Sequence, residues 1–163
     1  MNAWLRSSKC GRSSMATIHL PQDFKEFLKL LNDHQVEYLL VGGYAVGYYG
    51  YPRATADMDI WIALHPKNAE KIVAVLIEFG FNVPELSPVL FLRENQIIRM
   101  GLPPIRIEIT TTLSGVSFDI CYANRVIDIL DGVKVPLIRL EDLKINKRAA
   151  GRYKDLNDLE NLP

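Results

Sequence analysis

Residues 36–64 read VEYLLVGGYAVGYYGYPRATADMDIWIAL, and they hold the features from which the fold can be inferred. Residues 36–41 are mostly apolar, which is typical of a short buried strand. They lead directly into Gly42-Gly43, and residues 44–49 are apolar enough to predict a short helix after that turn. The stretch therefore predicts a strand, a glycine turn and a helix, in that order.

A second strand is predicted over residues 57–64, DMDIWIAL. Alternate side chains of a strand point to opposite faces, so the apolar even-numbered residues share one face and Asp57 and Asp59 share the other. At about 3.3 Å per residue, the two aspartates lie about 7 Å apart along the backbone. Neighbouring carboxylates repel each other, and a divalent cation relieves that repulsion. The pair therefore predicts a metal site, with a solvated strand face as the alternative.

Glu108 is a third candidate carboxylate. It lies in another predicted strand, residues 105–111, where isoleucines alternate with polar residues, so Glu108 points away from the apolar face. Oxygen ligands of this kind suit Mg²⁺ or Mn²⁺ better than zinc, and nucleotide phosphates commonly complete the coordination of Mg²⁺. The three carboxylates therefore favour a site that also binds a nucleotide.

Gly42-Gly43 has two interpretations. Glycines between a strand and a helix let backbone N–H groups approach phosphate oxygens. A Gly-Gly pair is also common in plain tight turns, and the sequence here has neither the GxGxxG pattern nor a P-loop. The order of the turn, Arg53, Thr55, the two aspartates and the later acidic strand favours a phosphate site beside a metal site.

The remaining elements are predicted from apolar periodicity and from proline and glycine boundaries. Helices are expected over residues 21–31, 66–80, 140–150 and 155–162, and strands over residues 97–100, 105–111, 125–130 and 133–138. Asp131-Gly132 indicates a two-residue hairpin between the last two strands. Residues 82–95 are expected to form a loop or a short helix. The chain is thus expected to have an α/β (α+β) fold, a mixed β-sheet flanked by helices.

Composition limits the classes of protein to consider. The 163 residues include 19 Lys and Arg and 19 Asp and Glu, so the overall charge gives no reason to expect wrapping around nucleic acid. Glycine or charge interrupts every long apolar stretch, and Cys10 and Cys121 have no metal-ligand spacing. These features favour a soluble, cytoplasmic protein without a membrane partner. Residues 1–15 are expected to be a disordered leader or to precede the true start, and residues 16–163 to form one domain.

Together these motifs resemble those of the minimal nucleotidyltransferases in the DNA polymerase beta-like superfamily. In that family an apolar strand and Gly-Gly or Gly-Ser are followed by Asp-x-Asp and later by a third carboxylate on a neighbouring strand. Here the corresponding residues are 39–43, LLVGG, then thirteen intervening residues, DMD at 57–59, and IEI at 107–109. Residues 50–61 and 140–159 also look like the small bacterial members, some of which act in toxin-antitoxin modules. The resemblance covers about residues 20–162.

The resemblance implies the nucleotidyltransferase fold and a set of site residues. It implies that the catalytic and metal-binding carboxylates are Asp57, Asp59 and Glu108. It also implies that the nucleotide-binding residues are Gly42, Gly43, Arg53, Thr55 and Lys147. Glu108 stands where such proteins more often have Asp. For Arg53 and Thr55, the alternative is a loop-stabilising arginine and a capping threonine.

Three basic residues share one face of the predicted helix over 140–150, because Lys144, Lys147 and Arg148 fall at i, i+3 and i+4. A basic helix face is commonly just solvated. The resemblance favours instead a contact of this face with nucleotide phosphates, above all through Lys147, with Asp155 supporting the site.

The implied activity is Mg²⁺- or Mn²⁺-dependent transfer of a nucleoside monophosphate from a nucleoside triphosphate, such as ATP, to an acceptor hydroxyl, with release of pyrophosphate. The alternative is a catalytically weak or inactive module of this fold that binds a cognate toxin or antitoxin protein. The acceptor stays open between an RNA end, a protein hydroxyl and a small molecule such as an antibiotic. Base preference and oligomeric state are also open.

Overall fold

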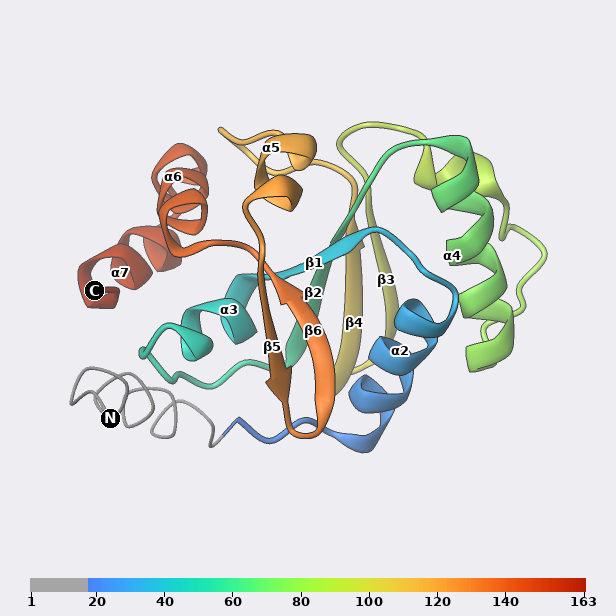
Figure 1. The fold of residues 1–163 in the computed structure, drawn as a ribbon, viewed down its shortest axis with the longest axis horizontal. Coiled ribbons are helices and arrows are strands. Elements are labelled where there is room, and N and C mark those ends of the chain that lie inside the picture. Colours follow the sequence, from blue (N-terminus) through green and yellow to red (C-terminus); the bar gives the residue numbers. More distant parts are fainter. Residues whose placement is uncertain (1–17) are drawn as a thin grey trace, which may run out of the picture.

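The computed structural model describes residues 18–163, and in this part of the chain a six-stranded sheet forms the centre of the molecule (Figure 1). The strands are β1 (Tyr38–Val41), β2 (Asp57–Ile62), β3 (Ile97–Leu102), β4 (Ile105–Thr110), β5 (Val126–Leu130) and β6 (Val133–Leu137), in the order β3-β4-β2-β1-β6-β5. The β2–β4 and β1–β6 pairs are parallel and the others antiparallel, so the sheet is mixed as predicted. The leader expected over residues 1–15 lies outside the described residues.

Helices lie on both faces of the sheet. They are α2 (Gln22–Asp33), α3 (Gly42–Tyr48), α4 (Pro66–Phe79), α5 (Phe118–Ala123), α6 (Leu140–Ala150) and α7 (Tyr153–Asn161), with a 3₁₀ turn, η1, at Pro88–Phe91. In Figure 1, α6 and α7 lie at one end of the molecule and α4 at the other. Within residues 18–163, no helix combines the length and the apolar character needed to cross a membrane.

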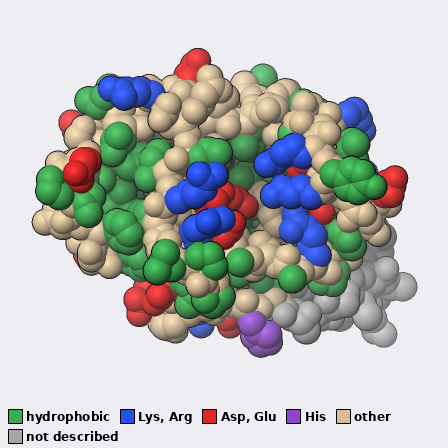
Figure 2. All heavy atoms as spheres, turned by 180° about the vertical axis from the view of Figure 1, so that it is seen from behind, with side chains coloured by type: hydrophobic (Ala, Val, Ile, Leu, Met, Phe, Trp, Pro, Cys, Tyr) green, Lys and Arg blue, Asp and Glu red, His purple; other side chains and the backbone are tan. Residues whose placement is uncertain are grey.

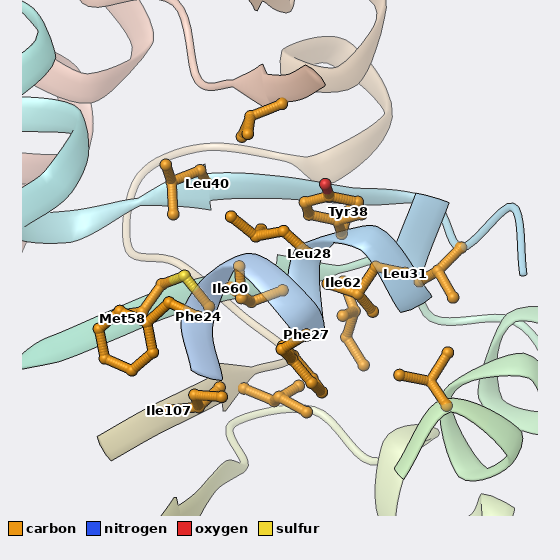
Figure 3. Close-up of a cluster of buried hydrophobic side chains, with 14 of the residues drawn as sticks. Phe24, Phe27, Leu28, Leu31, Tyr38, Leu40, Met58, Ile60, Ile62 and Ile107 are labelled. Carbon is orange, nitrogen blue, oxygen red and sulfur yellow. The ribbon is translucent and has the colours of Figure 1, made fainter. Parts of the chain in front are cut away.

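The larger core lies between the sheet and α2. The stripe predicted for this helix is fully buried, and its members are Phe24, Phe27, Leu28 and Leu31. Figure 3 shows these side chains against Met58, Ile60 and Ile62, which are the even-numbered residues of β2. Alternation along β2 therefore places its even-numbered apolar side chains in this core, as the sequence predicts.

A smaller core covers part of the opposite face of the sheet. Trp61 of β2 is buried there, and its ring meets that of Phe118 in α5 at 5.1 Å between centroids. Asp57 and Asp59 are on the same face of β2 as Trp61, but they are only partly buried. The two aspartates thus lie where α5 no longer covers the sheet.

Most predicted elements are confirmed, with shifts at their ends. The hairpin forms as expected, with positive φ at both Asp131 (48°) and Gly132 (83°). The first strand begins at Tyr38 because residues 34–36 complete the turn after α2, where the N–H of Val36 donates to the carbonyl of Leu31. Helix α5 was not predicted, because its six residues are too few to show a helical period.

Candidate functional site

One cavity gathers the residues that the sequence nominates as catalytic, metal-binding or nucleotide-binding. Its volume is about 160 Å³, and its walls come from the end of β1, from β2 and β4, and from α6 and the start of α7. Figure 2 shows a hollow on the face opposite to that of Figure 1, with acidic side chains between two groups of Lys and Arg. The nominated residues that line the cavity are Gly42, Gly43, Arg53, Thr55, Asp57, Asp59, Glu108 and Lys147. The fold therefore brings these distant segments together.

The three carboxylates come from two adjacent strands. Because β2 and β4 are parallel neighbours, Asp59 lies opposite Glu108 in the register. Burial, then the charge of Glu108 and a hydrogen bond with it, raises the pKa of Asp59 to about 7. The charge of Asp57 acts in the same direction, and that of Lys154 acts against it. The crowded carboxyl of Asp59 is therefore a place where added positive charge is favourable.

The chemistry of these carboxylates fits a divalent cation, because Mg²⁺ and Mn²⁺ prefer carboxylate oxygens. Two arginines hold some of those oxygens. Arg106 donates Nε and Nη2 to Asp57 at 3.0 and 2.8 Å, and Arg99 donates Nε to Glu108 at 2.8 Å. With the arginines in these positions, no three acidic, histidine or cysteine side chains among residues 18–163 are grouped so that they could hold a metal, and metal binding would need the carboxylates to rearrange. A cation bound at Asp57 would share these oxygens with Arg106 or displace it.

The glycine turn brings the backbone of β1 and α3 against the carboxylates. Gly42 has a φ of 66°, and a Cβ atom there would overlap Oδ2 of Asp59 and lie 2.8 Å from its Cγ. A Cβ atom on Gly43 would lie 2.6 Å from Oγ1 of Thr55 and 3.3 Å from Nη1 of Arg53. Neither position has room for a side chain, so only glycine lets the backbone come this close to the site.

Gly42→Ala is expected to destabilise the fold by about 2 kcal/mol, because alanine is strained at this φ and its methyl group collides with Asp59. Gly47→Ala in α3 is the matched control. Among the described residues nothing lies within 4 Å of a Cβ at Gly47, and alanine stabilises a helix interior by up to about 1 kcal/mol. Urea unfolding measures both variants. Unchanged stability of Gly42→Ala would contradict the close approach.

Arg53 and Thr55 both have partners within the protein. Arg53 donates Nε and Nη2 to Asp158 at 2.8 and 3.0 Å. Thr55 donates its hydroxyl to the backbone carbonyl of Asp57 at 3.1 Å. These contacts match the alternative roles, in which Arg53 and Thr55 stabilise the loop before β2. Their contact with phosphate or acceptor stays a prediction.

Lys147 lies at the centre of a buried charged network. Its Nζ is 3.1 Å from Asp155 and 3.0 Å from Asp158, and the three side chains are 5%, 1% and 1% exposed. Arg152 also donates to Asp155, at 2.8 Å, and Arg53 holds Asp158. Burial alone would raise the pKa of both aspartates, but the hydrogen bonds from these cations outweigh it and lower the pKa overall. The network joins the loop before β2 to α6 and α7.

The side chain of Lys147 lines the cavity and contacts carboxylates, and its contact with nucleotide phosphates stays a prediction. Two carboxylates already offset its charge, so Lys147 holds α6 and α7 together at the wall of the cavity. Its neighbours on the predicted basic face differ from it. Lys144 is half-buried and donates to the backbone carbonyl of Pro163, and Arg148 is exposed. Asp155 accepts hydrogen bonds from Lys147 and Arg152, and its support of the site stays a prediction.

Two cations that line the cavity, Arg152 and Lys154, were not nominated by the sequence analysis. Arg152 is paired with Asp155, whereas Lys154 forms no ion pair with any carboxylate in the part of the chain that the structure describes. The positive charge of Lys154 does act on Asp59, whose pKa it pulls downward. The signal in the sequence was the basic run RYK at 152–154, but only the packing of α7 shows that it faces the carboxylates.

Comparisons with known proteins identify a family and similar solved structures. A family model described as "nucleotidyltransferase of unknown function (DUF6036)" matches residues 18–162. A solved candidate nucleotidyltransferase from Thermotoga maritima has a TM-score of 0.58 and 16% identity, over 85% of this chain and 88% of that one. An antigenic nucleotidyltransferase-like protein from Paracoccidioides brasiliensis has a TM-score of 0.49 and 16% identity, over 82% and 70% of the two chains. The comparison with curated proteins gives no match.

The likeness to the Thermotoga protein shows the nucleotidyltransferase fold, which the resemblance in the sequence had implied. The family model extends over nearly all of the described residues, including both glycines of the turn and the three carboxylates. The chain therefore belongs to the DUF6036 family of nucleotidyltransferases.

Proposed function

We propose that this protein transfers a nucleoside monophosphate from a nucleoside triphosphate to an acceptor hydroxyl and releases pyrophosphate. One observation carries the proposal: Asp57, Asp59 and Glu108 line the same cavity as Gly42-Gly43, where the glycine turn closes on Asp59. The family and the fold support a general nucleotidyltransferase role, and the geometry adds residues suited to it.

The carboxylates Asp57, Asp59 and Glu108 would hold Mg²⁺ or Mn²⁺, which neutralises charge on phosphate oxygens and favours ionisation of the acceptor hydroxyl. The backbone N–H groups of Gly42 and Gly43 would contact the triphosphate. In the transfer, the acceptor oxygen forms a bond to the α-phosphorus, the bond from that phosphorus to pyrophosphate breaks, and the hydroxyl proton is released. The contribution of the chain is mainly to position the reactants and offset their charge.

Lys154 is a further lysine that is expected to contact the triphosphate, because it lines the cavity and has no carboxylate partner among the described residues. Lys154→Gln should weaken binding of ATP or the preferred triphosphate about tenfold, the value of one hydrogen bond to a charged group. Isothermal titration measures this effect. Lys134→Gln, on β6 and outside the cavity lining, is the control and should leave binding unchanged. Equal affinities of the two variants would rule out a phosphate contact by Lys154.

The transfer is tested with each α-labelled nucleoside triphosphate and either Mg²⁺ or Mn²⁺, added to cell extract that is then separated into RNA, protein and small-molecule fractions. We expect label in one fraction with the wild type and none with Asp57→Ala/Asp59→Ala. That fraction identifies the acceptor class. Absence of label from all fractions, with every triphosphate and metal, would contradict the proposed transfer.

A second candidate function is a binding module of the same fold without turnover. It is favoured by one observation: arginines already neutralise Asp57 and Glu108. Stable binding of a partner protein without label transfer would support it. A toxin or antitoxin partner and a cytoplasmic location stay predictions from the sequence.

A further inference from the structure

Arg106 lies among the carboxylates of the site, although no sequence pattern nominated it. Its guanidinium makes two hydrogen bonds to Asp57, one to each carboxylate oxygen, and its Nη2 lies 3.4 Å from Glu108. Both oxygens of Asp57 are therefore engaged by one cation. These are the oxygens with which Asp57 would bind a divalent metal.

The register of the sheet fixes Arg106 in this place. Arg106 and Glu108 are two residues apart on β4, so their side chains share one face of the sheet. The parallel pairing of β4 with β2 then sets Arg106 beside Asp57. If the pairing of β4 with β2 shifted by one residue, Arg106 would point into the apolar core. Burial of the apolar face therefore fixes the register that pairs Arg106 with Asp57.

Exposure distinguishes this ion pair from that of Lys147. The side chains of Arg106 and Asp57 are 31% and 26% exposed, compared with 5% and 1% for Lys147 and Asp155. When a partly exposed pair opens, water solvates both charges, so the cost is small. When a buried pair opens, each charge is left without a partner at a much higher cost. Arg106 can therefore exchange its partner, whereas Lys147 is fixed.

We propose that Arg106 is an internal cation that competes with the divalent metal for Asp57 and Glu108. Without metal it offsets the charge of these carboxylates and holds Asp57 in place, and metal binding requires this ion pair to open. Arg106 is thus a positioning residue that sets how tightly the site binds metal. The inference rests on the proposed function, because it needs a metal at these carboxylates.

Titration of the full-length chain with Mn²⁺ in the absence of nucleotide, followed by calorimetry, tests the competition. Arg106→Gln should bind Mn²⁺ about fivefold more tightly than the wild type, since the competing charge is gone. Arg106→Lys keeps the charge but cannot engage both oxygens of Asp57 in the same planar way, so its affinity should lie between the two. Because this readout is binding, it is independent of transfer activity.

Arg99→Gln is the matched control. Arg99 pairs with Glu108 from β3 but its side chain is 55% exposed, and no contact with Asp57 is present among the described residues. Its loss should change Mn²⁺ affinity by less than about twofold. A fivefold change in both arginine variants would point to general charge removal and overturn the specific role of Arg106.

Thermal unfolding shows whether each variant folds, and Arg106→Lys serves as the test if Arg106→Gln does not. If the wild type transfers label and binds Mn²⁺, but the Arg106 variants bind it no more tightly, the competition is wrong and the proposed function stands. If neither the wild type nor any variant binds Mn²⁺, both the competition and the metal-dependent transfer are wrong.

Discussion

Lys147→Met is expected to lower the free energy of unfolding by about 3 kcal/mol, because it removes the shared partner of two buried aspartates. Asp155 keeps Arg152 and Asp158 keeps Arg53, but the two carboxylates then face each other without the ammonium between them. Methionine retains most of the apolar volume of lysine, so the loss reports charge rather than a cavity. Urea unfolding at pH 7 measures it.

Lys144→Met, one turn earlier on α6, is the control and should cost less than about 0.5 kcal/mol, because Lys144 is only half-buried and donates to the backbone carbonyl of Pro163. The effect at Lys147 should also depend on pH. The native pKa of both aspartates is lowered, so their stabilisation is present above an unfolded pKa of 3.8 and is lost as the pH falls further. A loss that is equal at Lys144 and Lys147 would contradict the network.

Asp59→Asn should change activity and stability in opposite directions. Transfer should fall by at least about a hundredfold, because an amide cannot supply the charge that the site needs to hold a cation. Stability at pH 8 should rise, because the native pKa of Asp59 is about 7, against 3.8 when unfolded, so the fold disfavours the charged carboxylate. The resulting loss of folding stability begins as the pH rises above 3.8 and is complete above pH 7. Asparagine avoids it.

Thermal unfolding in a metal chelator at pH 8 and pH 4 measures the second effect, for which a gain of about 1 kcal/mol corresponds to roughly 2–4 °C. The gain should be present at pH 8 and absent at pH 4. Asp57→Asn is the matched control, because it removes the charge and leaves an acceptor for only one of the two hydrogen bonds from Arg106, so it should lower stability at pH 8. A loss of stability in Asp59→Asn at pH 8 would show that its carboxylate has favourable contacts instead.

The parts of the fold that could be predicted are those in which one face of an element is apolar. The stripe of α2 and the alternation of β2 are of this kind, since burial of one face imposes its period on the sequence. Helix α5 has only six residues, and its place is set by contact of Phe118 with Trp61. That contact joins residues that are distant in the sequence, so no local sequence pattern predicts it.

The residues of the candidate site also differ in how far the sequence predicts their roles. The motif residues Asp57, Asp59 and Gly42 carry a recognisable spacing, and all three line one cavity. The role of Lys147 could not be predicted from its own helix, because its partners lie on the next one, although the i, i+3 spacing of Asp155 and Asp158 was a usable signal. Arg106 could not be predicted as a site residue, because its contact with Asp57 depends on the strand register that pairs the two residues.

The two faces of β2 have consequences for how such a protein diverges. Met58, Ile60 and Ile62 are committed to the core, while Asp57 and Asp59 face the cavity. A substitution on one face leaves the packing of the other nearly untouched, since neighbouring side chains point in opposite directions. Related chains can therefore change the residues that face the cavity and keep the residues that form the larger core. The residues of the proposed site and those of the larger core can thus change independently, although they alternate along one strand.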